Sequence, residues 1–385
     1  MKVYLGPAGI PTTCLGNTEK GVREIADLGL NAMEMQFTYG VNLSLASAKA
    51  IGLVAKENGI RLSIHAPYYI NLCQQDAIKL ARSKRNVYES AERAEALGAK
   101  VTVEAGYVQA TARRLAGSAM FLGGRAGSTV LGTANVMMAA TLAEGVTVIE
   151  SAACEPEVVD LAKFLNAMGA NISGAGSPTI TITGVKQLHS AEHEVIPDRI
   201  ETATYAIAAA ATNGEVTLKG ARADHLHAVI DKLHEAGVAV QRQGANLVVR
   251  RRGRLKSSDV TTLPYSGFPT DVQAQMMALM TLAPGISIIT ERIFESRFMH
   301  VSELARLGAD IEIEGPSAIV KGGRPLSGAP VMASDLRASA ALVVAGLAAK
   351  GTTQVNRVYH IDRGYENIDG KLRQLGARIQ RVEES

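Results

Sequence analysis

Tryptophan is absent from this chain, and aromatic residues make up only 4% of its 385 residues. A surface that stacks nucleic-acid bases needs exposed aromatic rings, so this composition argues against such a surface. Cysteine is also scarce, because Cys14, Cys73 and Cys154 lie far apart and form no Cys-x-x-Cys pair. This spacing argues against both a disulfide framework and a structural zinc site.

The chain also lacks a large excess of charge of either sign, and it has no long apolar run. Forty Lys and Arg residues nearly balance 37 Asp and Glu residues, and the net charge of +3 gives no reason to expect a nucleic-acid or membrane surface. The basic run at 250–254 lies between two strand-like segments and is interpreted as a solvated hairpin. The apolar run at 338–349 is shorter than the roughly 18 to 20 residues that a membrane span needs. The composition therefore predicts a soluble, cytoplasmic protein whose partners must be inferred from its sites.

Glycine is plentiful, and its 37 residues mark an internal repeat. Each repeat begins with an Ala- and Met-rich helix, followed by a Gly, a β-branched strand, an amphipathic helix, a second Gly and two short strands. The unit recurs four times, with a period of about 70 residues, and half a unit precedes it at 97–110. The first glycines are Gly145, Gly214, Gly285 and Gly351, and the second are Gly169, Gly237, Gly308 and Gly376. The second glycine stands between a helix and a strand, where a left-handed cap favours a residue without Cβ.

Residues 1–96 follow a different pattern, in which short strands alternate with helices. Strands are expected at 3–5, 33–37 and 62–65, and helices at 21–28, 45–58 and 75–97. A βαβα order is typical of a parallel sheet or barrel, but so few units cannot close an eight-stranded barrel. The sequence therefore predicts a fusion of two α/β architectures that join near Leu97.

Seven strings in the repeat region match one family of enzymes. They lie at 134–140, 155–160, 196–201, 268–271, 297–301, 335–340 and 359–365. Through them, residues 97–385 closely resemble the UDP-N-acetylglucosamine 1-carboxyvinyltransferase family of enolpyruvyl transferases, cytoplasmic enzymes of peptidoglycan synthesis. The resemblance implies inside-out α/β barrel repeats, with a remnant of the first domain at 97–197 and the second domain at 198–385.

Members of this family transfer the enolpyruvyl group of phosphoenolpyruvate to the 3-hydroxyl of UDP-N-acetylglucosamine, without a metal or organic cofactor. The reaction needs a base near the hydroxyl, cations on the phosphate and carboxylate, and an acid at the enol carbon. The resemblance implies that Asp271 contacts the sugar hydroxyl and that Arg337 and Arg363 hold phosphoenolpyruvate. A planar guanidinium suits this role because it can donate two hydrogen bonds to one anion. The residues that the resemblance places at the substrates, mainly the sugar nucleotide, are Ser128, Thr129, Val130, Gly132, Ile293 and Arg297.

Simpler structural roles stay open for the three central residues. Asp271 follows Pro269 at the start of an expected helix, where an aspartate commonly acts as a cap. Arg337 and Arg363 each have an aspartate just upstream, Asp335 and Asp362, so local ion pairs are the alternative for both arginines.

The chain departs from the family pattern at its front. Family members carry an early Lys-Asn pair and a Gly-rich loop whose cysteine donates the proton, and this sequence shows neither. Losing such a proton donor typically lowers the rate by about 10²-fold to 10⁴-fold. The leading hypothesis is an enolpyruvyl transferase, and the second is a non-catalytic binder of the sugar nucleotide.

Three strings near the front, at 6–9, 28–34 and 63–71, carry a second resemblance. Through them, residues 1–96 resemble the start of an endonuclease IV-like or xylose isomerase-like TIM barrel. That resemblance places a zinc ligand at His65, whereas Glu104 stands at the next strand end, where relatives usually have His. A catalytic metal site needs at least three protein ligands, so no metal is expected. A metal-dependent hydrolase of abasic DNA or a sugar remains a third hypothesis on this resemblance.

Overall fold

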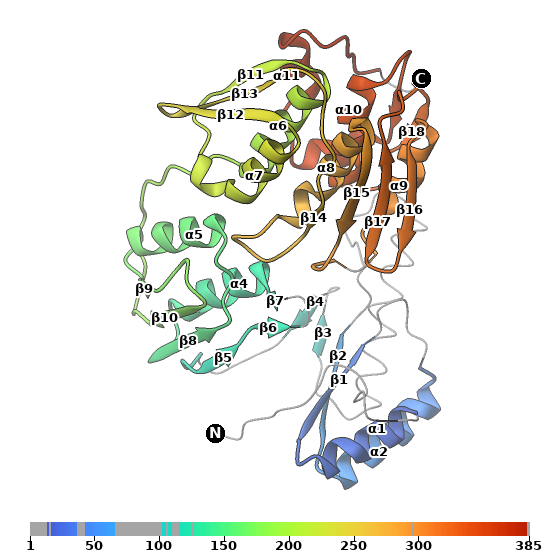
Figure 1. The fold of residues 1–385 in the computed structure, drawn as a ribbon. Helices are drawn as coiled ribbons and strands as arrows, with labels where there is room; N and C mark the ends of the chain where they lie inside the picture. Colours follow the sequence, from blue (N-terminus) through green and yellow to red (C-terminus); the bar gives the residue numbers. More distant parts are fainter. Residues whose placement is uncertain are drawn as a thin grey trace. The chain divides into compact units, whose positions relative to one another are not determined.

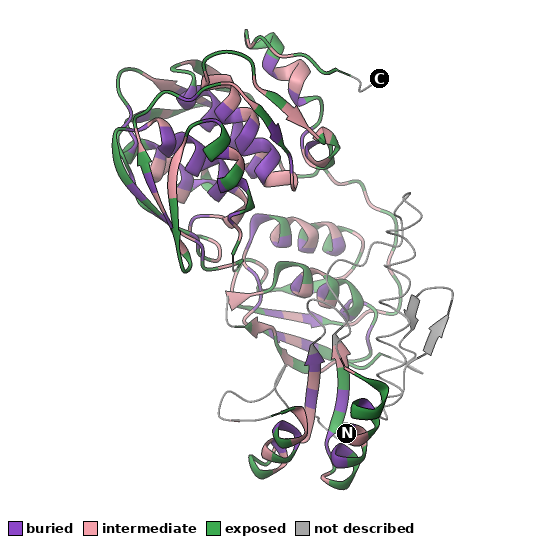
Figure 2. Ribbon diagram, turned by 90° about the vertical axis from the view of Figure 1, so that its right-hand side faces the viewer, coloured by how far each residue is buried: buried purple, intermediate pink, exposed green. Residues whose placement is uncertain are grey.

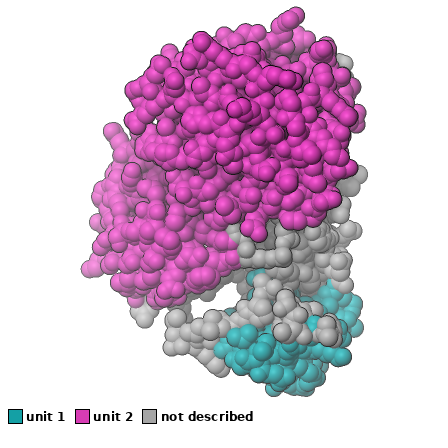
Figure 3. Space-filling model, in the orientation of Figure 1, with its two compact units in different colours: residues 1–113 teal, residues 114–385 magenta. Residues whose placement is uncertain are grey.

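The structure, a computed structural model, describes residues 14, 17–36, 43–65, 102–104, 107–109, 115–124, 127–294 and 296–382. None of the helices in these ranges has the length and apolar character that a membrane crossing requires. The chain divides into two compact units, Met1–Arg113 and Arg114–Ser385 (Figure 3). The join expected near Leu97 lies outside the described residues.

Unit 1 contains a pair of parallel strands with two helices. The elements are α1 (Thr18–Asp27), β1 (Ala32–Gln36), α2 (Leu45–Glu57) and β2 (Arg61–His65). β1 pairs with β2 in parallel, and a parallel pair needs a crossover, which here contains α2. Apolar side chains of both helices and both strands share one cluster, which includes Val22, Ile25, Met33, Ile51 and Leu62. The βαβ prediction is confirmed for these elements, whereas the expected strand at 3–5 and helix at 75–97 lie outside the described residues.

Two more strands of unit 1 belong to the half repeat predicted at 97–110. β3 (Thr102–Glu104) and β4 (Tyr107–Gln109) form an antiparallel pair. The strands expected there are therefore confirmed.

Unit 2 contains the four predicted repeats (Figure 1). The first is α4 (Val130–Ala140), β8 (Val146–Glu150), α5 (Pro156–Ala167), β9 (Asn171–Ser173) and β10 (Thr179–Thr183). The second is α6 (Arg199–Ala211), β11 (Glu215–Leu218), α7 (His227–Glu235), β12 (Val238–Gln243) and β13 (Asn246–Arg251). The third is α8 (Thr270–Leu282), β15 (Gly285–Thr290), α9 (Met299–Arg306), β16 (Asp310–Glu314) and β17 (Ser317–Gly322). The fourth has α10 (Leu336–Ala348), β19 (Gln354–Asn356) and α11 (Ile368–Gln374).

Shorter elements lie before and between the repeats. They are β5 (Ala119–Phe121), β6 (Gly123–Gly124), β7 (Gly127–Ser128), β14 (Val260–Thr261), β18 (Pro330–Met332), and the 3₁₀ helices η1 (Ala223–His225) and η2 (Val358–Arg363).

The glycines predicted to end helices adopt the expected conformation. Gly169, Gly237, Gly308 and Gly376 have φ values of 97°, 82°, 93° and 97°. Each lies just beyond α5, α7, α9 or α11, so the left-handed cap is confirmed in all four repeats.

The end of the fourth repeat differs from its prediction. Residues 377–382 form no strand. The carbonyl of Ile379 accepts a hydrogen bond from Arg373 Nε at 3.1 Å, and the Arg381 guanidinium pairs with Asp362 at 2.7 Å. These side-chain contacts hold the segment against η2 and α11 instead of against a sheet, so the prediction of two closing strands is wrong here.

Three helices, α6, α8 and α10, form the centre of residues 198–385 (Figures 1 and 2). Ten consecutive residues of α8, from Val272 to Thr281, are buried, so this helix has no solvent-facing side along that length. The sheets β11-β13-β12 and β14-β15-β17-β16 lie outside the helices. Helices on the inside and sheets on the outside are the inside-out arrangement that the resemblance implied. The α/β fold class is therefore confirmed.

The first repeat has a hydrophobic cluster of its own. Its sheet has the order β5-β8-β10-β9, and α4 packs against α5. Buried members of the cluster include Met137, Ile149, Val158, Ile172 and Ile180. An ion pair of 2.8 Å between Glu157 of α5 and Arg199 of α6 connects this repeat to the second one.

Gly322 in the third repeat has no room for a larger side chain. A Cβ there would collide with the backbone carbonyl oxygens of Met280 and Ala283, at the end of α8. We expect Gly322→Ala to lower the free energy of unfolding by about 1–3 kcal/mol, because backbone atoms must move to admit the methyl group. Urea unfolding measures this. Gly124→Ala is the control, since its Cβ meets only Gly127 O at 3.7 Å, and an equal loss in both variants would contradict the prediction.

Candidate functional site

Asp271 is the second residue of α8, and its carboxylate is held between two arginines. Arg297 Nη1 lies 2.9 Å from Asp271 Oδ1, and Arg337 Nη2 lies 3.0 Å from Asp271 Oδ2. Both carboxylate oxygens are therefore engaged by cations, and the capping role considered for Asp271 is not the one its side chain takes. The side chain still keeps 38% of its surface exposed, so it can meet a ligand.

The aspartates upstream of Arg337 and Arg363 do not pair with the guanidinium groups of these arginines. Asp335 is the N-cap of α10, and its carboxylate accepts from the backbone N–H groups of Arg337 and Ala338 at 2.8 and 3.0 Å. Asp362 pairs with Arg381. The local ion pairs considered for both arginines are therefore wrong. The Asp335 carboxylate binds the N terminus of α10, and the Asp362 carboxylate binds Arg381 instead.

The two arginines control the ionisation of Asp271. Burial alone would raise the pKa of its carboxyl group, but the charges of Arg337 and Arg297, with their hydrogen bonds, outweigh burial and lower the pKa below its ordinary value. Burial also disfavours the charge on Arg337, and Asp271 outweighs it and raises the pKa of that guanidinium. Asp271 and Arg337 are therefore both ionised at neutral pH.

Arg337 is supported from behind by a buried polar network. Its Nη1 lies 3.4 Å from the hydroxyl of Tyr365, which is 2.9 Å from Thr204 Oγ1 and 3.2 Å from Gln275 Nε2. Thr204 Oγ1 donates its hydrogen to the carbonyl of Ile200, so Tyr365 must donate to Thr204 and accept from the other two. The network joins α6, α8 and α10 beneath the arginine.

Arg363 does not join the Asp271 cluster through a hydrogen bond or ion pair within the described part of the chain. It ends η2, two residues before Tyr365. The segment that carries Arg363 thus contacts the cluster through the hydrogen bond between Tyr365 and Arg337. Asp271, in contrast, pairs directly with Arg297 and Arg337.

Sequence reasoning missed Glu291, which lies next to this cluster. Its side chain is buried, with 2% of its surface exposed, and it accepts hydrogen bonds from Thr262 Oγ1, Thr270 Oγ1 and the backbone N–H groups of Ile293 and Phe294. Its position one residue after β15 resembles that of many surface carboxylates, so the sequence carried no signal for its burial.

The predicted nucleotide loop lies at the start of α4. Thr129 is the N-cap, and its Oγ1 accepts from the backbone N–H of Gly132 at 3.2 Å. Ser128 ends β7, and Val130 is the first residue of the helix. A Cβ at Gly127 would lie 2.6 Å from Pro264 Cγ, which places this loop against the segment that leads to α8. Helix N termini favour anions such as phosphate groups.

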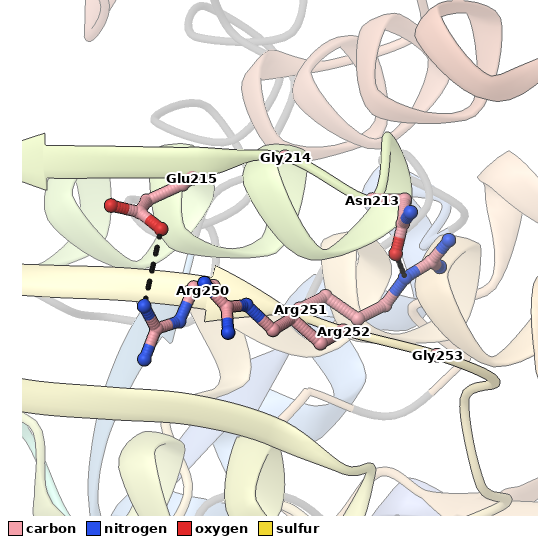
Figure 4. A pocket seen from close by; sticks show the side chains of 7 residues that line it. All are labelled: Asn213, Gly214, Glu215, Arg250, Arg251, Arg252 and Gly253. Atoms are coloured by element: carbon pink, nitrogen blue, oxygen red, sulfur yellow. Dashed lines mark hydrogen bonds and ion pairs between the residues drawn. The ribbon is translucent and has the colours of Figure 1, made fainter.

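A hollow of about 390 Å³ lies at the end of β13, apart from these residues (Figure 4). Arg250 faces Glu215 at 3.5 Å, and Arg251 Nε donates to Asn213 Oδ1 at 2.9 Å. Glu215 offsets the charge of Arg250, and Arg251 and Arg252 leave the lining of the hollow with a net positive charge. The hairpin interpretation of 250–254 is wrong, because the turn of the β12–β13 hairpin lies at Gly244, whose φ is 62°.

Cysteine and metal chemistry find little support in the described ranges. Burial raises the pKa of the Cys154 thiol, and the charge of Glu155 adds to the shift. Cys73 lies outside the described residues, as do the side chains of His65 and Glu104. The described residues hold no group of three or more His, Cys, Asp or Glu that could bind a metal ion.

Two family models match the chain. The model of EPSP synthase (3-phosphoshikimate 1-carboxyvinyltransferase) matches residues 84–372, and that of the xylose isomerase-like TIM barrel matches residues 22–123. The two matches overlap around the expected join.

Curated relatives and solved structures agree with the first match. The chain is 57% identical over 291 residues to UDP-N-acetylglucosamine 1-carboxyvinyltransferase 2 of Carboxydothermus hydrogenoformans, covering 75% of this chain and 68% of that protein. It is 55% identical over 288 residues to the UDP-N-acetylglucosamine 1-carboxyvinyltransferase of Desulfosudis oleivorans, with the same coverage. The enolpyruvyl transferase NikO from Streptomyces tendae superposes with a TM-score of 0.65 at 27% identity, covering 73% of this chain and 69% of that one. EPSP synthase from Acinetobacter baumannii, at 17% identity, TM-score 0.57 and coverage of 92% and 80%, shows the shared fold.

Ionised Asp271 stabilises the fold, and this contribution should depend on pH. Because its pKa is lowered on folding, the contribution is complete above the unfolded value of about 3.9 and is lost as pH falls through the folded value. We expect the difference in unfolding free energy between the wild type and Asp271→Asn to shrink below about pH 4. Urea titrations from pH 6 to pH 3 measure it. Asp231→Asn, at an exposed site of α7, is the control, and equal pH profiles for both variants would contradict the assignment.

Proposed function

Because the chain belongs to the UDP-N-acetylglucosamine 1-carboxyvinyltransferase family of enolpyruvyl transferases, we propose that it transfers the enolpyruvyl group of phosphoenolpyruvate to the 3-hydroxyl of UDP-N-acetylglucosamine. The observation that carries the proposal is the Asp271 carboxylate, half exposed between Arg297 and Arg337 at the start of a buried helix. The proposal includes a place in peptidoglycan precursor synthesis in the cytoplasm.

In this proposal Asp271 binds the sugar hydroxyl. An ionised carboxylate accepts the hydroxyl hydrogen, and it becomes a stronger base when its arginines turn to another anion, since each arginine lowers its pKa. Phosphoenolpyruvate is such an anion. Binding of both substrates would therefore activate the base by moving positive charge from Asp271 to the phosphate and carboxylate groups.

Arg337 and Arg363 are proposed to hold phosphoenolpyruvate. Asp271 and Tyr365 hold the Arg337 guanidinium in position through hydrogen bonds, and Arg363 is the last residue of η2, two residues before Tyr365. Two guanidinium groups can bind phosphate and carboxylate separately, which would orient the enol carbon and stabilise the departing phosphate.

The sugar nucleotide is proposed to lie along two segments. Ile293 would contact the sugar, and Arg297 would hold substrate beside Asp271. Ser128, Thr129, Val130 and Gly132 would bind the nucleotide at the N terminus of α4, where backbone N–H groups favour phosphate. The proximity of Gly127 to Pro264 supports a single site that both segments share.

The domain division proposed with this function is 1–96, 97–197 and 198–385. Residues 97–197 would contribute the nucleotide loop, and residues 198–385 the groups that meet the reacting atoms. Residues 1–96 would form a TIM-barrel-like segment without a part in the reaction.

A second candidate, a non-catalytic binder of the sugar nucleotide, is favoured by the missing loop cysteine and Lys-Asn pair. Cys154 does not replace that cysteine by motif, because it follows Ala152-Ala153 and precedes Glu155 instead of lying in a Gly-rich loop. The two candidates share a binding site and differ only in turnover.

Binding and phosphate release together test this proposal. We expect the wild type to bind both substrates in calorimetry, and Arg337→Met to weaken phosphoenolpyruvate binding by about 10-fold to 100-fold, since charge-assisted hydrogen bonds contribute about 1.5–3 kcal/mol. Arg324→Met, which removes an exposed arginine that pairs with Asp310, is the control and should bind normally.

Release of phosphate from the two substrates then separates the candidates. Release above background identifies the enzyme, and binding without release identifies the binder. A wild type that binds neither substrate would contradict both.

A further inference from the structure

Glu291 is a buried carboxylate whose four hydrogen-bond donors are all neutral groups. Thr262 Oγ1 lies 2.6 Å and Thr270 Oγ1 2.8 Å from it, and the backbone nitrogens of Ile293 and Phe294 lie at 2.8 and 3.0 Å. Burying a charge is costly unless hydrogen bonds compensate it, and these four come from three separate segments. The carboxylate therefore fixes the positions of those segments relative to one another.

One of these donors leads to the Asp271 cluster. Thr270 has a single hydroxyl hydrogen, which it gives to Glu291, so its oxygen is free to accept from Arg297 Nη1 at 2.9 Å. The same Nη1 donates to Asp271 Oδ1 at 2.9 Å. Glu291 thus orients the Thr270 hydroxyl, and this hydroxyl holds the Arg297 guanidinium in its position against Asp271.

The other donors lead to the segment of the proposed sugar site. Glu291 Oε1 accepts from the N–H groups of both Ile293 and Phe294, which closes a tight turn directly after β15. The Phe294 ring in turn lies beneath Arg297, with 5.2 Å between the guanidinium carbon and the ring centroid. The Glu291 carboxylate therefore holds the backbone at Ile293 and Phe294. It also orients the Thr270 hydroxyl, which, like the Phe294 ring, contacts the Arg297 guanidinium.

We propose that Glu291 is a positioning residue for enolpyruvyl transfer, which holds the sugar-binding turn at Ile293 and the Arg297–Asp271 pair in one fixed arrangement. This inference rests on the proposed function for the identity of the ligand. The hydrogen bonds through which Glu291 acts are present in the free protein. Part of its effect is therefore measurable without any substrate.

A purely structural role makes different predictions from a positioning role. A residue that only stabilises the fold lowers the melting temperature when replaced and leaves Asp271 titration unchanged. Replacing a positioning residue also changes how strongly Arg297 acts on Asp271. A guanidinium that loses its hydrogen bond to Thr270 spends less time against the Asp271 carboxylate.

The first experiment uses Thr270→Val in the full chain. Valine keeps the shape of threonine and removes only the hydroxyl between Glu291 and Arg297. We expect the pKa of Asp271, followed by carbon-13 NMR of its carboxyl group, to rise toward its ordinary value, and Thr270→Ser to restore the wild-type titration. An Asp271 titration in Thr270→Val equal to that of the wild type would overturn the inference.

The second experiment uses Glu291→Gln, which retains the side-chain shape and removes the charge. Hydrogen bonds to a neutral acceptor are roughly half as strong, so the turn at Ile293 loosens and UDP-N-acetylglucosamine affinity should fall by about 3-fold to 10-fold in calorimetry. The control is Glu312→Gln, which removes an exposed carboxylate paired with Lys321 on the outer sheet. Equal affinities in Glu291→Gln and Glu312→Gln would overturn the inference.

The two experiments separate this inference from the proposed function. If the wild type binds no UDP-N-acetylglucosamine, the proposed function fails, and the titration of Asp271 in Thr270→Val still decides whether the Thr270 hydroxyl, through which Glu291 would act, positions Arg297. If the wild type binds but either variant behaves as its control, the inference fails alone. Should Glu291→Gln not fold, Thr270→Val, which leaves the buried carboxylate in place, carries the test.

Discussion

The Asp271 carboxylate between Arg297 and Arg337 is the interaction on which the arrangement of this site depends. The two arginines stand 26 and 66 residues further along the chain, so the contact closes only when α8, α9 and α10 have taken their places. Burial alone would raise the pKa of this carboxyl group. Held by two cations it is charged, oriented and still open to a ligand.

The inside-out architecture explains why such a contact forms at this end of the molecule. Asp271 and Arg337 are the second residues of α8 and α10, two central helices that pack against each other. Their N termini bring partial positive charge to the same region as the arginines. The Asp335 carboxylate meets part of this positive charge at α10, and the Asp271 carboxylate meets the two guanidinium groups.

Much of the fold could be predicted from the sequence, because the repeat depends on local signals. A glycine after a helix and a β-branched strand after the glycine act over a few residues, and the structure follows them at Gly169, Gly237 and Gly308. The site was harder, since its partners are distant. Asp335 is nearer to Arg337 in sequence than Asp271 is, yet the helix N terminus takes Asp335. Glu291 could not be foreseen, because its burial follows from three segments that meet only in the folded chain.

The hydroxyl of Tyr365 has a consequence for how proteins of this kind diverge. Its contacts with Thr204, Gln275 and Arg337 tie three helices through one oxygen, and the direction of each hydrogen bond is fixed by its neighbours. Thr204 Oγ1 accepts the hydrogen of the Tyr365 hydroxyl, so a loss of the Thr204 hydroxyl leaves that buried hydrogen without its acceptor. Substitutions at Thr204 and Tyr365 should accordingly accumulate in concert across related sequences, even though the two positions are 161 residues apart.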